Sequence, residues 1–333
     1  MMENTKTHSS VQAEILRYTK YLIALAILLF LFKRLVGLIE ELKVESISFS
    51  PFFLLISCVI LIFYRTLQIS PWLKIYQKIA LKPVSIFSVW IFFQLSELGK
   101  YLPGKVGHFL GIIALSRPLG IAKTEAIVST LLQLVFQCVL GVLVGLPVLY
   151  SPTAKEFLRS LLDKFQHNII YFIGILLVIV GLCAFFCILL QKQLRDSMMY
   201  LRKGIQAVFS TMGTLRLIVI YLLLWVHSGI AFFFFVKSIY PIHVTQFPII
   251  MSIFAFAWSI GFMTMVTPGG LGVREGILSL LLTSCLPPAT ATLVALLSRI
   301  WVICIEIILA GVAFGCYIRQ KQIIPNIEET NSN

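Results

Sequence analysis

The sequence predicts an all-α, polytopic integral membrane protein, because of its composition, the length of its apolar runs and the way two of those runs are interrupted. Of the 333 residues, 59% are hydrophobic and only 12% are charged, whereas soluble domains carry about 25% charged residues. The apolar runs approach the ~20 residues that a helix needs to cross ~30 Å of hydrocarbon, without the period-two alternation of barrel strands. Helices are the expected spanning element, since each satisfies its own backbone hydrogen bonds.

Six apolar runs are long enough to span the membrane. They cover residues 16–38, 51–68, 124–149, 168–191, 215–237 and 289–317. Lys33 and Arg34 follow the first run, where a signal peptide would have a small-residue cleavage site, so an uncleaved helix is expected there. We expect a single membrane domain over 16–320, with tails at 1–15 and 321–333.

Two further apolar segments are interrupted by proline and glycine. Residues 83–98 and 106–115 are separated by a stretch that contains Pro103 and Gly104, and 247–266 and 273–286 by Thr-Pro-Gly-Gly-Leu-Gly at 267–272. Proline lacks an N–H and glycine frees the backbone to turn. The pattern predicts two re-entrant helical hairpins; the alternative is two pairs of kinked or short spans.

The distribution of cations predicts the orientation of these elements. Segments 65–82 and 192–216 are rich in Lys and Arg and hold a single acid, Asp196, so we expect both to be cytoplasmic loops. With both termini cytoplasmic, the first hairpin then enters from the cytoplasm and the second from the opposite side. This arrangement is an inverted repeat, with a first half over about 51–149 and a second over about 215–317.

A repeated motif supports the duplication. The pattern P-G-x-x-G-x-x-x-G-I begins at Pro103 and again at Pro268, an offset of 268 − 103 = 165 residues. Beyond the motif we align Gly145 with Gly311, and likewise Cys138 with Cys304, at an offset of 166 that requires one inserted residue. The alternative is convergent use of the same turn residues.

Ionisable side chains at membrane depth are costly and are therefore functional candidates. Around the first interruption they are Glu97, Lys100, Lys105 and His108, after the second they are Arg274 and Glu275, and within the last run they are Arg299 and Glu306. Glu97 and Lys100 are three residues apart and Arg299 and Glu306 seven, so each pair can share a helix face. They form either structural ion pairs or a buried site for a phosphate-bearing headgroup.

The remaining polar residues point away from catalysis. The only aspartates, Asp163 and Asp196, lie in expected loops, and the five histidines show no metal-ligand spacing. We expect neither metal nor cofactor. For His227 a helix-to-helix hydrogen bond is favoured over a proton relay, and Arg117 is equally well a loop cation or a ligand contact. The net charge of +13 fits basic loops beside lipid headgroups, so no nucleic-acid partner is expected.

Leu98–Lys105, Arg117 with Gly120 and Ile121, and Thr267–Glu275 together resemble the lysylphosphatidylglycerol synthase transmembrane-region family of flippase-like proteins. The resemblance covers roughly residues 15–320. Its motif residues are Glu97, Pro103, Gly104, Pro268, Gly269, Gly270 and Gly272. Relatives often place an aromatic residue and an arginine where this chain has Gly107, His108 and Gly111. The synthases of the family carry a soluble transferase domain; the sequence stops soon after Arg319, so lipid aminoacylation is not expected.

The resemblance implies an inner-membrane protein that translocates or presents an amphipathic lipid, either an aminoacylated phospholipid or a polyisoprenyl-linked glycan. The two hairpins are expected to form a pseudo-symmetric cavity for the headgroup, lined by Lys100, Lys105, Arg117, Arg274, Glu275, Arg299 and Glu306. One alternative is an enzyme or accessory subunit acting on polyisoprenyl phosphates, with Glu97 or Glu275 as a base. Another is a scaffold for a glycan-assembly complex. Membrane lipids are the expected partners in all cases, with glycan- or lipid-synthesis enzymes in the last two.

Overall fold

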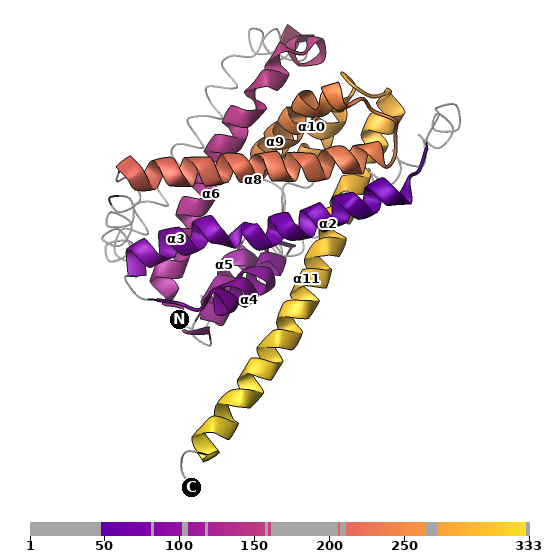
Figure 1. Cartoon of the computed structure of the whole chain (residues 1–333). Coiled ribbons are helices and arrows are strands. Elements are labelled where there is room, and N and C mark those ends of the chain that lie inside the picture. Colours follow the sequence, from indigo (N-terminus) through magenta and orange to yellow (C-terminus); the bar gives the residue numbers. More distant parts are fainter. Residues whose placement is uncertain are drawn as a thin grey trace, which may run out of the picture.

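The computed structural model describes residues 48–80, 83–101, 106–116, 119–156, 159–160, 206, 211–263 and 272–330. Every regular element within these ranges is a helix (Figure 1). The prediction of an all-α protein is confirmed.

Five helical stretches of the described chain are long and apolar enough to cross a membrane. They are Pro51–Ala80, Lys123–Tyr150, Gly213–Lys237, Val244–Met263 and Pro288–Arg319. Four of them coincide with predicted spans, and the predicted spans at 16–38 and 168–191 lie outside the described residues. The fifth, Val244–Met263, coincides with the first limb of the second predicted hairpin. With 20 residues it is long enough for a full span. The re-entrant shape of both hairpins, and the number of full spans, stay predictions.

The first half of the described chain contains α2 to α6. In order, its elements are α2 (Pro51–Leu67), α3 (Ile69–Ala80), α4 (Ile86–Glu97), η1 (Leu98–Tyr101), α5 (Val106–Ser116), α6 (Lys123–Gly145) and η3 (Leu146–Tyr150). The start of α2 places a proline in the first turn, where its missing N–H costs nothing. Since α4 has 12 residues and α5 has 11, each is about 16–18 Å long, which is shorter than the ~30 Å hydrocarbon layer.

The described part of the segment 65–82, residues 65–80, is not the loop that its cations indicated. It continues α2 into α3, with Trp72 and Ile75 completely buried and Lys74 exposed. An amphipathic helix with its cations on one face carries as many charges as a basic loop, but it buries its other face. Loop counting from charge alone therefore missed this helix.

The second half has a similar order of elements, but α8 is followed by η4 where α2 is followed by α3. It consists of α8 (Thr211–Lys237), η4 (Val244–Gln246), α9 (Phe247–Met263), α10 (Val273–Leu282) and α11 (Pro288–Thr330). In Figure 1 the α4–α5 pair and the α9–α10 pair lie on opposite sides of the layer formed by α2 and α8. Helix α11, in yellow, crosses the molecule and extends well beyond the other helices at its C-terminal end (Figure 1).

Contacts between the two halves follow a two-fold exchange. Helix α6 packs on α9, and its counterpart α11 packs on α4; α5 packs on α6, and its counterpart α10 packs on α11. In the centre, α2 packs on α8, and each helix donates one side-chain hydrogen bond to the other's backbone. Ser57 Oγ donates to the Ala231 carbonyl at 2.8 Å, and His227 Nε2 lies 3.2 Å from the Ile60 carbonyl. The favoured role of His227, a helix-to-helix hydrogen bond, is thus present in the structure.

Burial along α6 and α11 establishes the register between the halves. At an offset of 165, most buried positions of one helix fall on buried positions of the other. These pairs include 126 with 291, 129 with 294, 133 with 298, 137 with 302, 140 with 305, 141 with 306 and 145 with 310. The same offset separates the two glycine motifs, so the register is constant over both segments.

Burial favours pairing Gly145 with Ala310, one residue from the predicted alignment with Gly311. Gly145 is buried and Gly311 is exposed, whereas Ala310 is buried. A shift of one residue turns a helical position by about 100° and moves it off the packed face. Cys138 and Cys304 differ for the same reason, since Cys138 is buried and Cys304 is exposed. No inserted residue is needed.

Candidate functional site

A buried charge cluster lies where α2, α4 and α11 meet, and Arg65 is at its centre. One terminal nitrogen of the Arg65 guanidinium forms an ion pair with Glu306, and the other lies 3.7 Å from Glu97 Oε2. The side chains of Arg65 and Glu306 are only 11% and 3% exposed. Because Glu306 belongs to the second half and Arg65 and Glu97 to the first, this Arg65 cluster ties the two halves together.

The sequence did not single out Arg65, because it was counted as a loop cation. Its helical context carried a usable signal: the buried positions Leu61, Tyr64, Gln68 and Trp72 recur every three or four residues through the region. Such spacing marks one continuous buried helix face. Arg65 is next to that face, so its side chain is held among other helices.

A second cluster forms where α10 meets α11. Arg299 lies 3.9 Å from Glu275 Oε1, and Arg274, the residue before Glu275, is itself buried. The guanidinium of Arg274 lies 5.5 Å from the centre of the Phe254 ring on α9, within cation–π range. We call Arg274, Glu275 and Arg299 the Arg299 cluster.

Glu275 also holds the start of α10. Its Oε2 accepts a hydrogen bond from the Gly272 N–H at 2.8 Å, which satisfies a backbone donor at the helix N-terminus. Gly272 has a φ of 85°, a left-handed conformation that favours glycine. The second motif thus fixes one carboxylate oxygen of Glu275 in a helix cap, while the other oxygen faces Arg299 at 3.9 Å without a hydrogen bond from any described residue.

The ion pairs differ from those that sequence spacing indicated. Arg299 and Glu306 can share a helix face, but seven residues of helix separate them by about 10 Å. Each turns instead to another helix, Arg299 to Glu275 and Glu306 to Arg65. Glu97 likewise reaches Arg65, while the side chain of its predicted partner Lys100 lies outside the described residues.

Several predicted site and motif residues fall in ranges that the structure does not describe. They are Lys105, Arg117, Pro103, Gly104, Pro268, Gly269 and Gly270. For Lys100 and His108 only the backbone is described, in η1 and α5. Among the described residues, no group of three or more His, Cys, Asp or Glu side chains could hold a metal ion.

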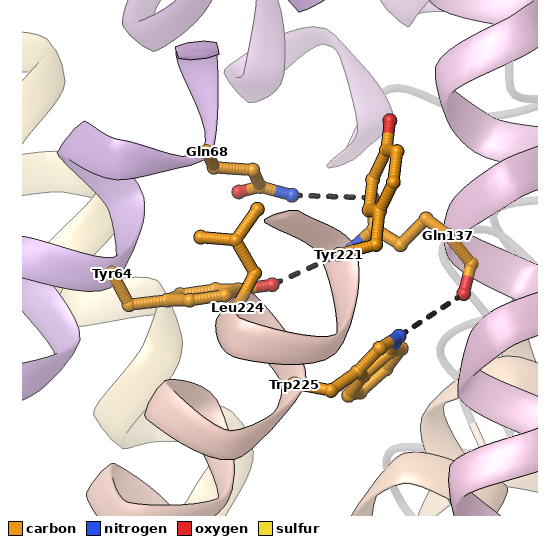
Figure 2. Close-up of a pocket in the computed structure, with 6 residues that line it drawn as sticks. All are labelled: Tyr64, Gln68, Gln137, Tyr221, Leu224 and Trp225. Carbon is orange, nitrogen blue, oxygen red and sulfur yellow. Dashed lines mark hydrogen bonds between the residues drawn. The ribbon is translucent and has the colours of Figure 1, made fainter. Parts of the chain in front are cut away.

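A narrow pocket between α2, α6 and α8 adjoins the Arg65 cluster. Figure 2 shows the six side chains that line it: Tyr64, Gln68, Gln137, Tyr221, Leu224 and Trp225. None of them is charged. Gln68 connects the pocket to the cluster, because its Oε1 accepts a hydrogen bond from Arg65 at 3.2 Å. The sequence analysis named none of these residues, since uncharged polar side chains within apolar runs are ordinary links between helices.

The charged residues do not follow the two-fold relation of the helices. At the offset of 165, Glu306 corresponds to Gly141, Arg299 to Leu134 and Glu97 to Phe262. Arg274 and Glu275 correspond to Phe109 and Leu110. Among the described residues, the duplicated helices therefore carry an asymmetric set of ion pairs. The pseudo-symmetric cavity between the two hairpins stays a prediction.

Comparison with known proteins identifies the family. The family described as "Lysylphosphatidylglycerol synthase TM region" matches residues 18–310. No curated protein and no solved structure matches the chain. The match covers both charge clusters, four of the five membrane-length helices completely and the fifth as far as residue 310. The chain is thus an integral membrane protein and belongs to the lysylphosphatidylglycerol synthase transmembrane-region family.

Proposed function

We propose that the protein is a flippase-like translocator, which moves or presents an anionic amphipathic lipid across the cytoplasmic membrane. The lipid class is an aminoacylated phospholipid or a polyisoprenyl-linked glycan. Membership of the family supports a membrane protein of lipid modification or transport. The proposal includes cytoplasmic termini at both ends and contains no covalent step, so the protein acts without being an enzyme.

The observation that carries this proposal is the burial of the Arg65 cluster between the two halves. Arginine and glutamate inside a membrane bundle are costly to place there, and they commonly mark a substrate pathway. Arg65, Glu97 and Glu306 come from three different helices and both halves. A relative movement of the halves would therefore have to break or rearrange the Arg65–Glu306 pair, which joins them.

The chemistry of the clusters suits a phosphate headgroup. A guanidinium binds carboxylate and phosphate through the same forked geometry, so a headgroup phosphate can replace a carboxylate at an arginine. The Arg65–Glu97 and Arg299–Glu275 contacts, at 3.7 and 3.9 Å, are longer than a hydrogen bond and are the natural places for exchange. Glu275 keeps its hydrogen bond to the Gly272 N–H when Arg299 moves to the phosphate.

The remaining predicted contacts complete the proposed site. Lys100, Lys105 and Arg117 add cations at the first hairpin, and Arg274 adds one at the second. Glu306 balances the charge of Arg65 while the site is empty. Membrane lipids are the proposed partners.

The test is a headgroup-accessibility assay in proteoliposomes that contain fluorescent aminoacylated phosphatidylglycerol. We expect added protein to speed lipid exchange between leaflets, and Arg299→Gln to slow it by about tenfold or more, since a hydrogen bond to a charged group contributes about 1.5–3 kcal/mol. The matched control is Arg319→Gln, on the same helix but exposed. It should leave the rate unchanged.

An exchange rate equal to that of protein-free vesicles would count against translocation of this lipid. Equal rates for Arg299→Gln and the unmodified protein would remove the Arg299 cluster from the proposed site. Polyisoprenyl-phosphate sugars are the second substrate to be measured in the same assay.

A further inference from the structure

The Arg65 guanidinium has a third partner besides the two carboxylates, and that partner begins a chain of hydrogen bonds. Arg65 donates to Gln68 Oε1 at 3.2 Å. Gln68 Nε2 donates to Gln137 Oε1 at 3.2 Å, and Gln137 Nε2 donates to the Tyr64 hydroxyl oxygen at 3.4 Å. All four side chains are largely buried, and the chain passes from α2 to α6 and back to α2 (Figure 2).

The chain has only one consistent direction. Arginine is a donor without acceptor atoms, so Gln68 must turn its oxygen towards Arg65 and its NH₂ towards Gln137. Gln137 must then present its oxygen to Gln68 and its NH₂ to Tyr64. Each amide is thereby fixed in the orientation that leaves an acceptor facing the guanidinium.

The backbone of α6 is fixed at the same place. Trp225 Nε1 donates to the Gln137 carbonyl at 3.3 Å, and one turn earlier the Tyr221 hydroxyl donates to the Gln133 carbonyl at 3.3 Å. Both donors come from α8, in the second half. The main chain of Gln137 is therefore held by α8, in the second half. Its side chain is linked through Gln68 to Arg65 on α2, in the first half.

We propose that Gln68, Gln137 and Tyr64 are positioning residues that hold the Arg65 guanidinium in place for the headgroup phosphate. This inference rests on the proposed function and deepens it. When a phosphate displaces Glu97, Arg65 loses one of its lateral contacts, and the Gln68 oxygen keeps the guanidinium from following the departing carboxylate. Gln137 acts at one remove, because it prevents Gln68 from rotating its amide.

The chain offers a matched control in Gln133. It lies on α6 one turn before Gln137 and is also buried, but only its backbone carbonyl is bonded by Tyr221, which a substitution of the side chain preserves. Gln137→Leu and Gln133→Leu thus make the same chemical change on the same helix. Only the first breaks the chain to Arg65.

The experiment measures how far phosphatidylglycerol raises the thermal unfolding midpoint of the full-length protein in detergent. We expect Gln137→Leu to reduce this lipid-induced shift by at least half, and Gln133→Leu to leave it unchanged. The effect should be graded, largest for Gln68→Leu and smallest for Tyr64→Phe, which removes only the last and longest bond. In an Arg65→Met background, Gln137→Leu should cause no further reduction.

A purely structural role would give a different result. In that case Gln137→Leu would lower the unfolding midpoint without lipid by the same amount in the unmodified protein and in the Arg65→Met variant, and would leave the lipid-induced shift intact. Gln137 would then only link helices, and the proposal would be overturned. The two proposals can fail separately. If the lipid-induced shift depends on Gln137 but the protein does not move lipid between leaflets, the positioning role of Gln137 is supported and the translocation proposal is contradicted.

Discussion

The crossing of α6 over α9 and the crossing of α11 over α4 occupy equivalent places in the two halves, yet they are built differently. In the first, glycines bring the backbones together: a Cβ atom added at Gly145 would lie 2.7 Å from the Cβ and 2.8 Å from the Cα of Phe256. Gly141 is equally closely covered, by Ser259 and by the ring of Trp225. This crossing is sealed by contact between helices.

The second crossing has a carboxylate at the position of that glycine. Glu306 corresponds to Gly141, and instead of allowing close approach it reaches across to Arg65. The corresponding position to Gly145 is Ala310, which is buried without being a glycine. One crossing is thus held by dense packing, the other by ion pairs that a charged ligand can rearrange. The difference teaches that a duplicated scaffold need not carry duplicated chemistry.

The largest expected effect is at the charged crossing. Arg65→Ala leaves Glu306 buried without the arginine that pairs with it, and breaking a buried pair in this way costs about 3–5 kcal/mol. Unfolding of the purified protein in detergent measures the loss. Lys74→Ala, an exposed cation on α3, should change stability by less than about 0.5 kcal/mol. A loss for Arg65→Ala as small as that of the control would mean that packing alone holds this crossing.

An intermediate effect is expected at the glycine crossing. Gly145→Ala forces α6 away from Phe256, and such overpacking costs about 1–3 kcal/mol. At Gly311 nothing lies within 4 Å of an added Cβ, so Gly311→Ala should be neutral or stabilise the helix by up to about 1 kcal/mol. The same unfolding assay compares the two variants. Equal losses would favour the alignment of Gly145 with Gly311 and argue against the constant offset of 165.

The smallest effect is expected at the contact of α2 with α8, where each helix donates one side-chain hydrogen bond to the backbone of the other. His227→Leu removes the hydrogen bond to the Ile60 carbonyl, and bonds of this kind between membrane helices contribute about 0.6 kcal/mol. Ser57→Ala, which removes the bond to Ala231, should cost a similar amount. If His227→Leu abolished lipid exchange at unchanged stability, the proton-relay interpretation would replace the structural one.

Much of the architecture was predictable because it depends on local properties of the chain. Run lengths and composition predicted helices of membrane length, and the two Pro-Gly motifs lie where α4 and η1 are followed by α5 and where α9 is followed by α10. Glu275 was singled out as an ionisable residue at membrane depth. Its hydrogen bond to the Gly272 N–H is seen only in the structure. The 165-residue offset was also readable, and burial extends it through α6 and α11.

The pairing of the charges was not predictable, because it depends on which helices touch. Spacing along one helix indicated that Arg299 and Glu306 share a face, but the low polarity of a bundle interior rewards direct contact, and only a neighbouring helix brings an opposite charge close enough. Arg65 escaped notice for a related reason: a cation at the end of an apolar run looks like a loop residue until the following helix is seen to be buried.

The sequence by itself determined that this chain is a helical membrane protein with two related halves, since hydropathy, turn residues and repeated motifs are local properties of the sequence. Only the tertiary structure decided that Arg65 is the centre of the charged site and that Gln137 supports it. The contacts that decide this include one from Gln68 to Gln137, 69 positions apart, and one from Arg65 to Glu306, 241 positions apart. No local pattern specifies them, because they exist only once the helices have packed.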